Sequence, residues 1–379
     1  MALVLNEEQQ MLKDAAREFL ADKAPVSHLR ALRDTVDEQG FSRVLWHEMV
    51  ELGWSGIMVE EKYGGLDFGL SGLGVVLEEL GRTLTPSPLF STALLGAAAL
   101  KLGGNEEQKK QLLPGMIAGD TILALAADEG SCYRPHEIKT TARRDGEAFL
   151  ISGQKSSVID GHVADYLIVA ARTSGVSGEQ AGISLFLVPG QTTGVSIERT
   201  IMVDAHNSAN VTFDSVRVGS DTLLGELDAG ASVLERVWDM GRIGQAAELL
   251  GVSLCAFEMT LEYLQQRKQF GVPVGSFQAL QHRAAEIFGE IELLKSVVLK
   301  ALQAADEDAE DLPLLASLAK AKAAQVASKT CCEAIQMHGG IGMTDEYDLG
   351  FYIKRAKVLS QQLGDEGFHL DRFARLRGY

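Results

Sequence analysis

The sequence predicts an α+β fold that is mostly α, with helices at both ends of the chain and short strands between them. Apolar residues recur at helical spacing over residues 1–120 and again after Gly230. Between these parts, short runs rich in β-branched and aromatic residues alternate with turn residues. A chain of 379 residues exceeds what one hydrophobic core usually organises, so we expect two or three packed domains.

The N-terminal part is predicted to be a small helical domain. Asn6 followed by Gln9 resembles a capping box, and the apolar residues after it share one helical face until Pro25 stops the run. A second helix is expected over residues 41–52, ending at Gly53.

The central part is predicted to be a compact barrel or sandwich. Its candidate strands are residues 149–152, 166–171, 183–188, 195–202 and 211–218. Turn residues such as Asp145-Gly146 separate them, and five or more short strands in a row are typical of such folds.

The C-terminal part is predicted to be a four-helix bundle. Large apolar side chains between Leu250 and Leu264 step by four and three residues, as on one face of a helix. Comparable stretches cover residues 276–305 and 313–337, and long helices with short breaks are typical of bundles.

Composition excludes several classes of function. The net charge of -17 opposes binding to nucleic acid or to an anionic bilayer, because both depend on clustered Lys and Arg. The four cysteines form no CxxC pair, so neither a metal site nor a disulfide framework is expected. The first residues are too briefly apolar for a signal peptide, and no run approaches the roughly 18 apolar residues of a membrane span. We therefore expect a cytoplasmic protein.

Two segments at predicted helix junctions are candidates for ligand binding. One is RKQFG (267–271), followed by FQ (277–278) at the start of the next helix. The other is QMHGGIGMT (336–344), whose paired glycines permit close backbone approach to a ligand. Taken singly, each is better explained as a helix cap, with Gly271 or Gly339 in the left-handed conformation.

In this order and layout, the two segments resemble the acyl-CoA dehydrogenase family. The resemblance extends over almost the whole chain. Its motifs are GWSG (53–56), YGGL (63–66), EELGR (78–82), GQK (153–155), RKQFG with FQ, and QMHGGIGMTDEY (336–347). It implies an N-terminal helical domain (1–120), a middle β-barrel (121–225), a C-terminal helical bundle (226–379), and FAD at a subunit interface.

The resemblance also implies roles for individual residues. Those that match positions holding the FAD of a neighbouring subunit are Arg267, Gln269, Phe277, Gln278, Gln336, Met337, His338, Gly339 and Gly340. Asp239 and Arg242 match positions that contact pantetheine and shape the acyl-CoA site; the alternative for them is a solvated helix pair. The implied partners are an acyl-CoA substrate, electron transfer flavoprotein, and further subunits in a homo- or hetero-oligomer, either a dimer or a tetramer.

The sequence departs from the family at the catalytic base. Relatives use a glutamate to remove the α proton of the acyl-CoA, and the matching residue here is Leu363, followed by Gly364. A minority of relatives place the glutamate at the position of Gly241. Neither residue accepts a proton. The nearest carboxylates by register are Asp365 and Glu366, with Glu248 next, but for each of them a structural role as a carboxylate near a helix N-terminus is the favoured reading.

The middle region departs as well. The Thr-Glu-Pro-Gly loop of relatives corresponds to residues 127–130, which read ADEG, and the Trp-x-Thr that flanks the flavin ring corresponds to 157–159, which read SVI. Contacts to the adenosine end of FAD therefore look better preserved than contacts to the reactive ring.

Three readings remain open on the sequence. The chain is an FAD-dependent acyl-CoA dehydrogenase with a displaced base, or a non-catalytic or half-site subunit whose partner supplies the base, or a flavoenzyme of the same fold with another reaction. In lacking the usual glutamate it resembles the small subunits of mixed assemblies in the family.

Overall fold

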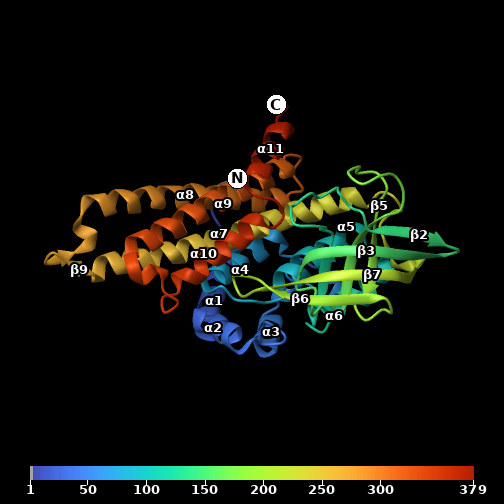
Figure 1. Ribbon diagram of the computed structural model, residues 1–379, viewed down its shortest axis with the longest axis horizontal. Helices are drawn as coiled ribbons and strands as arrows, with labels where there is room; N and C mark the ends of the chain where they lie inside the picture. Colours follow the sequence, from blue (N-terminus) through green and yellow to red (C-terminus); the bar gives the residue numbers. More distant parts are fainter. Residues whose placement is uncertain (1–2) are drawn as a thin grey trace. The chain divides into compact units, whose positions relative to one another are not determined.

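The computed structural model describes residues 3–379, and Figure 1 shows their order along the chain. The helices are α1 (Glu7–Lys23), α2 (Val26–Thr35), α3 (Arg43–Glu51), α4 (Gly69–Thr83), α5 (Ala97–Gly103), α6 (Glu106–Ile117), α7 (Gly230–Gln266), α8 (Gln278–Asp306), α9 (Leu312–His338), α10 (Leu349–Gln361) and α11 (Glu366–Leu376). The strands are β1 (Leu123–Ala126), β2 (Thr141–Asp145), β3 (Ala148–Ile159), β4 (Tyr166–Arg172), β5 (Ile183–Pro189), β6 (Val195–Ile201), β7 (Asn207–Gly219), β8 (Leu223–Leu224), β9 (Lys268–Gln269) and β10 (Val272–Pro273). The predicted sequence of helices, strands and helices is confirmed.

Local signals in the sequence correspond to local structure. The Asn6 side chain accepts from the Gln9 amide at 2.7 Å, and the Gln9 side chain accepts from the Asn6 amide at 3.1 Å, so the predicted capping box begins α1. Gly53, just after α3, has a φ of 80°, which glycine adopts at little cost. Gly146, at the turn between β2 and β3, has a φ of 64°.

The chain divides into two compact units. The helical unit contains the chain up to Thr35, together with Gly74–Thr85 and Arg242–Tyr379; the mixed unit contains Val36–Leu73 and Pro86–Gly241. The boundaries at residues 120 and 225 that the sequence suggested stay a prediction.

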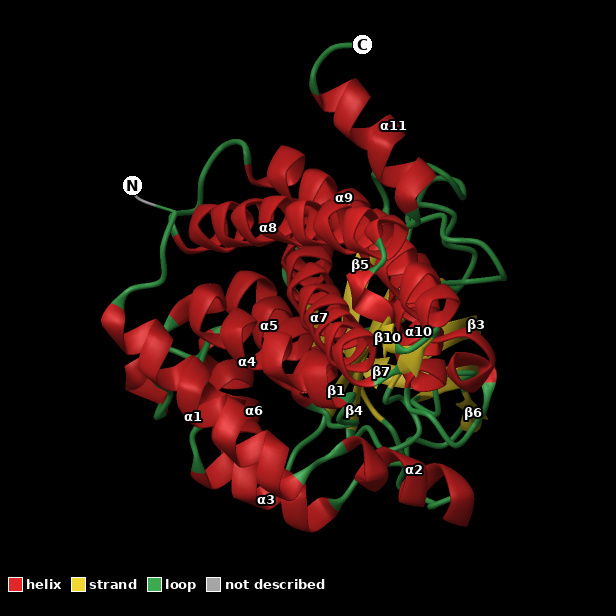
Figure 2. Ribbon diagram, turned by 90° about the vertical axis from the view of Figure 1, so that its left-hand side faces the viewer, coloured by secondary structure: helices red, strands yellow, loops and turns green. Residues whose placement is uncertain are grey.

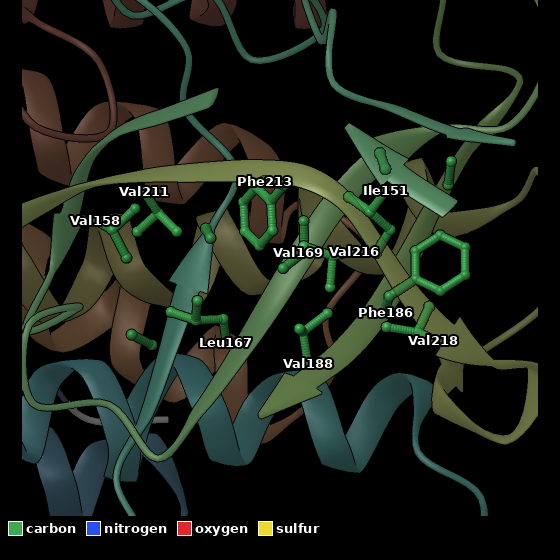
Figure 3. Packing of buried hydrophobic residues seen from close by; sticks show 14 of the residues in the cluster. Ile151, Val158, Leu167, Val169, Phe186, Val188, Val211, Phe213, Val216 and Val218 are labelled. Atoms are coloured by element: carbon green, nitrogen blue, oxygen red, sulfur yellow. The ribbon is translucent and has the colours of Figure 1, made fainter. Parts of the chain in front are cut away.

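The mixed unit is built on one sheet with the strand order β6-β7-β3-β2-β4-β5-β8, and β1 pairs with β4 in parallel. The strand-rich middle part that the sequence predicted is confirmed, and among the described residues no pairing of β6 with β8 closes this path. Inward-facing side chains of the sheet form one apolar cluster, which includes Phe186 and Phe213 (Figure 3). The rings of Phe149 and Phe186 in this cluster lie 5.1 Å apart. Sequence reasoning missed β1, β2 and β8, because each is short and lacks a clear period.

In the helical unit, α9 is the central helix and packs against α8, α10 and α11, as Figure 2 shows from one end. Two glycines let α4 lie directly on α7. A Cβ on Gly81 would be 2.1 Å from the carbonyl oxygen of Glu248, and one on Gly251 would be 1.8 Å from that of Glu78. Any larger residue at these positions would push the two helices apart.

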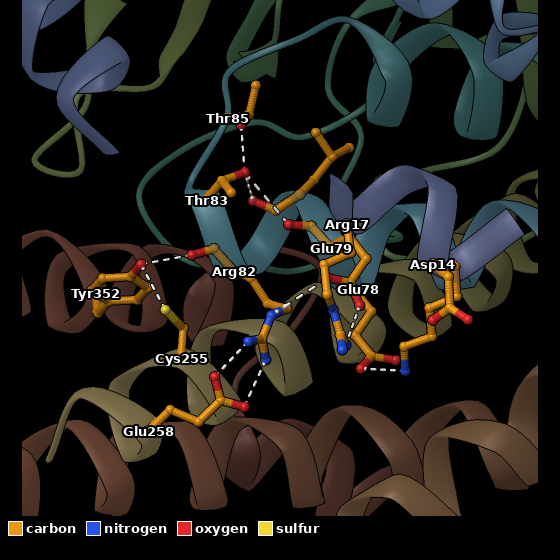
Figure 4. Close-up of polar contacts among 12 residues, drawn as sticks. Asp14, Arg17, Glu78, Glu79, Arg82, Thr83, Thr85, Cys255, Glu258 and Tyr352 are labelled. Carbon is orange, nitrogen blue, oxygen red and sulfur yellow. Dashed lines mark hydrogen bonds and ion pairs between the residues drawn. The ribbon is translucent and has the colours of Figure 1, made fainter. Parts of the chain in front are cut away.

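A polar network joins α4, α7 and α10 around Arg82 (Figure 4). The Arg82 guanidinium donates to the Glu258 carboxylate, and the backbone carbonyl oxygen of Arg82 accepts from the Tyr352 hydroxyl at 2.6 Å. Glu79, at 1% exposure, accepts two hydrogen bonds from Arg17 of α1 at 2.9 and 3.1 Å. The EELGR motif thus fixes neighbouring helices of one unit through charged groups that are paired rather than left bare.

Within residues 3–379, no helix is both long and apolar enough to cross a bilayer. All four cysteines are free thiols, and the described residues contain no cluster of side chains that could hold a metal ion.

Candidate functional site

The two segments predicted to hold a dinucleotide lie at the same end of the helical unit. After α7 the chain forms the short hairpin β9-β10, and α8 begins at Gln278. The ring of Tyr263, in the last turn of α7, stacks on the ring of His338, the last residue of α9, with centroids 4.3 Å apart. The ends of α7 and α9 are therefore in direct contact.

These segments leave room for a ligand. The side chains of Arg267, Gln269 and Gln278 are exposed, and no described residue in 3–379 forms an ion pair with Arg267. A Cβ added to Gly339 or Gly340 would meet nothing within 4 Å. A guanidinium group beside uncovered backbone suits a pyrophosphate, because it can pair two oxygens while the glycines admit close approach. The cradle fits the FAD that the sequence implies.

Two of the residues predicted to contact FAD are buried beneath the exposed Arg267 and the glycines. Met337 and His338 are 7% and 3% exposed. The His338 Nδ1 lies 2.7 Å from the Ala334 carbonyl oxygen and therefore donates to it, while Nε2 accepts from the Tyr347 hydroxyl at 3.1 Å. Burial lowers the pKa of His338, which favours this neutral form.

The predicted substrate residues Asp239 and Arg242 are both buried in α7, at 2% and 0% exposure. They are not a solvated pair on a helix surface. The Arg242 Nε donates to the carbonyl oxygen of Leu363 at 3.3 Å, and its guanidinium lies 5.7 Å from the centre of the Phe368 ring.

The position that matches the catalytic base lies in a turn between α10 and α11. Leu363 is 5% exposed and has a φ of 56°, a conformation unusual for a branched side chain. Its carbonyl oxygen also accepts from His369 Nε2 at 3.0 Å. The fully buried Lys320 ammonium donates to the carbonyl oxygens of Leu359 at 2.7 Å and Gly364 at 3.0 Å. Three basic side chains therefore hold this turn by its backbone.

The electrostatics of the turn follow from burial. Burial, together with nearby Arg242, lowers the pKa of Lys320 to about 7. Burial, with Arg242 and Lys320 close by, lowers the pKa of His369 to about 2, so its imidazole is neutral. These groups donate hydrogen bonds to the backbone, and the side chain at position 363 is apolar.

The other carboxylates have visible structural contacts. The Asp365 side chain caps α11 by accepting from the Phe368 amide at 2.8 Å. Asp365 and Glu366 line a cavity of about 380 Å³ together with Cys332 and Lys357. Glu248 is buried and accepts from Arg355 at 2.7 and 2.6 Å.

The altered loop of the mixed unit is closed by a buried ion pair. One oxygen of Glu129 accepts from Lys155 Nζ at 2.6 Å, and the backbone amides of Lys139 and Thr140 also donate to this carboxylate. Burial opposes ionisation of Glu129, but Lys155 outweighs it and the pKa is lowered. Val158 is packed into the sheet core, which leaves the exposed Ser157 as the side chain presented by this segment.

Sequence reasoning missed Lys320, His369 and Tyr347. A signal for Lys320 existed, because it lies at helical spacing with Ala316 and Ala323, which are both buried. A lysine on such a face must find partners or lose its charge. Nothing comparable marked His369. Tyr347 was present only as the last residue of the QMHGGIGMTDEY motif, without a role of its own.

Family models for acyl-CoA dehydrogenases match the chain with their N-terminal domain over residues 6–120, their middle domain over 124–216, and their C-terminal domain over 228–376. The chain belongs to the acyl-CoA dehydrogenase family. Members of this family are FAD-dependent flavoproteins, and FAD is the cofactor of this chain. Its activity is accordingly of the acyl-CoA dehydrogenase type, an oxidoreductase reaction on a CH–CH bond.

Three comparisons describe its place among acyl-CoA dehydrogenases. "Probable acyl-CoA dehydrogenase YngJ" of Bacillus subtilis is 32% identical over 95% of each chain. The structure of a variant of the "Tcur3481-Tcur3483 steroid ACAD" is 33% identical, with a TM-score of 0.88 over 98% of each chain. A chain of the ChsE4-ChsE5 complex from Mycobacterium tuberculosis is 26% identical, with a TM-score of 0.90 over 100% of this chain and 99% of that one.

Proposed function

We propose that this acyl-CoA dehydrogenase chain is a half-site subunit of a heteromeric enzyme. It completes the FAD site of a related subunit, and that subunit supplies the catalytic base. The observation that carries the proposal is the turn between α10 and α11, at the position of the family's catalytic base. There Leu363 is apolar and buried, and the side chains of Lys320, Arg242 and His369 donate hydrogen bonds to the backbone.

The other site residues also favour a chain that contributes to FAD binding and relies on a partner subunit for the base. The segments matched to the adenosine end of FAD are open and carry the exposed Arg267, whereas the residues at the base position offer no proton acceptor. By their printed names, two of the similar structures are assemblies of two different components. A heteromeric assembly is therefore the arrangement that we propose for this chain.

In the proposed assembly, this chain binds cofactor and substrate, and the partner subunit removes the proton. Dehydrogenation removes the α proton of an acyl-CoA thioester and transfers the β hydrogen as hydride. FAD, when bound, supplies the hydride acceptor. In this chain, Arg267 would pair the pyrophosphate, Gly339 and Gly340 would offer backbone amides, and Arg242 with Asp239 would shape the acyl-CoA site. The partner's carboxylate would take the proton. We further propose that electron transfer flavoprotein reoxidises the assembly.

A second candidate function has one observation in its favour. Asp365 and Glu366 border a cavity that also contains Lys357, so either carboxylate could serve a ligand placed there. In this case the chain would be a complete acyl-CoA dehydrogenase with a displaced base.

Removal of both carboxylates separates the two functions. In the assembly with its partner, Asp365→Asn with Glu366→Gln is expected to leave turnover within about twofold of the unchanged assembly, because asparagine still caps α11. If either residue is the base, turnover falls by about 10²- to 10⁴-fold. The measurement is flavin bleaching in the stopped flow with a panel of acyl-CoA thioesters. Glu310→Gln, at an exposed carboxylate on the loop between α8 and α9, is the matched control.

A further inference from the structure

An ion-pair network fixes the loop that follows the glycines of the predicted FAD site. Arg33, on α2, donates to both oxygens of Asp345 at 2.6 and 2.9 Å. Arg30, one turn earlier, donates to Asp345 at 3.1 Å and to Asp348 at 2.7 Å. We call these four residues the arginine tether. It joins α2 to the loop between Gly339–Met343 and α10.

The tether has a defined geometry. The guanidinium carbons of Arg30 and Arg33 lie 4.7 and 4.8 Å from the centre of the Phe351 ring, which is 3% exposed. Each arginine is thus held by an aromatic ring as well as by carboxylates. Isolated exposed ion pairs contribute little, but a bidentate fork within a network restricts the positions of all its members.

A second set of contacts leads from the tether to the FAD site. Tyr347 lies between Asp345 and Asp348 in the sequence, and its hydroxyl donates to His338 Nε2 at 3.1 Å. His338 directly precedes Gly339 and stacks on Tyr263. Tyr263 is four residues before Arg267, so one series of contacts joins the tether to both halves of the predicted FAD site.

We propose that Arg30, Arg33 and Tyr347 are positioning residues for FAD, although the two arginines are on an N-terminal helix outside the predicted cofactor site. The inference rests on the proposed role of Arg267, Gly339 and Gly340 in binding FAD. The tether fixes the loop before α10, and this loop carries Tyr347. The Tyr347 hydroxyl in turn fixes the His338 imidazole, which lies between the Arg267 segment and the glycine segment of the predicted FAD site. Without the tether, Gly339 and Gly340 are no longer held in a fixed position relative to Arg267, and the affinity for the dinucleotide falls.

The tether should respond to salt rather than to moderate acid. The hydrogen bonds from Arg33 lower the pKa of Asp345 to about 2, so its carboxylate stays charged at any pH that the fold experiences in use. Asp345 is exposed, however, and added salt screens exposed charges over a Debye length of about 8 Å at physiological ionic strength.

The test measures FAD affinity in the protein purified with its partner subunit, stripped of flavin and titrated with FAD by flavin fluorescence. Arg30→Gln with Arg33→Gln is expected to raise the Kd about tenfold, within the usual range for coupling between sites. Tyr347→Phe, which removes only the hydroxyl, should shift the Kd in the same direction. Arg43→Gln is the matched control, because Arg43 also lies over an aromatic ring, that of Phe41, but belongs to the other unit.

A charge exchange separates positioning from general stability. Arg33→Asp and Asp345→Arg should each weaken FAD binding. The double variant should bind FAD more tightly than Asp345→Arg alone, because one pair of opposite charges is restored, but only partly, since Arg30 still faces position 345. A merely structural role would lower the thermal unfolding midpoint and leave the Kd unchanged. The proposal is overturned if the Arg30 and Arg33 double variant binds FAD within twofold of the unchanged protein, or if the charge exchange binds FAD no better than Asp345→Arg alone.

The two proposals fail in different ways. If the unchanged protein takes up no FAD with any partner, the proposed function is wrong. Hydrogen exchange of the loop 339–348 then decides on the tether alone. Faster exchange in the double variant and unchanged exchange in the Arg43→Gln control support it, and equal exchange in both contradicts it.

Discussion

Glu248→Gln is expected to lower the free energy of unfolding by about 3–5 kcal/mol, the usual cost of leaving one member of a buried ion pair without its partner. The Glu248 carboxylate is 5% exposed and accepts two short hydrogen bonds from Arg355, which is itself 9% exposed. An amide is close to a carboxylate in size, so the packing is preserved while Arg355 loses the negative charge of Glu248. Urea unfolding followed by far-UV circular dichroism measures the change.

Two controls sharpen this experiment. Lys329→Gln breaks the exposed pair with Glu286, at 2.6 Å, and should cost less than about 1 kcal/mol. Glu248→Leu combined with Arg355→Met removes both charges and should recover most of the stability that the single substitution loses. If Glu248→Gln lowers the free energy of unfolding by less than about 1 kcal/mol, the ion pair between Glu248 and Arg355 does not stabilise the packing of α7 against α10 as we expect.

Arg267→Ala is expected to raise the Kd for FAD by about 10- to 150-fold, because a charged hydrogen bond to a pyrophosphate is worth about 1.5–3 kcal/mol. Arg267 is exposed and has no ion-pair partner among residues 3–379, so its removal should leave the fold intact. Equilibrium titration of the stripped assembly with FAD gives the affinity directly.

The matched control is Arg217→Ala. Arg217 is an exposed arginine on β7 that pairs with Asp145 at 3.2 Å and lies in the other unit. Its removal should leave the Kd within about twofold, since it has no proposed contact with the cofactor. Equal Kd values for the two variants would remove Arg267 from the FAD site.

Much of the fold could be predicted from the sequence because local patterns determine it. The apolar stripe from Leu250 to Leu264 lies inside α7, and the capping box at Asn6 begins α1 as expected. The open path of the sheet could not be predicted, because strand order depends on pairings between residues far apart in the sequence. The short β1 pairs in parallel with β4, about 40 residues later, and no local period reveals that.

The candidate site could be predicted only where ligand contact depends on residue type. Arg267 and the paired glycines became candidates through the resemblance to the family, and a guanidinium group beside bare backbone suits a pyrophosphate. Their contact with FAD stays a prediction. Lys320 and His369 act through their contacts with the carbonyl oxygens of the turn at Leu363, and such contacts depend on the fold rather than on spacing. The tether joins Arg33 to Asp345 across 312 positions of sequence, and no motif connects the two.

If this chain binds FAD but does not supply the base, flavin retention and bleaching should depend on the presence of a partner subunit. The chain is purified alone and after co-expression with a related subunit that carries the family's glutamate, and each sample is examined by visible absorbance and by addition of acyl-CoA thioesters. We expect the co-expressed assembly to hold FAD and to bleach, while the chain alone does not bleach. Full FAD content and rapid bleaching in the chain alone would show instead that the chain is a complete dehydrogenase with a base of its own.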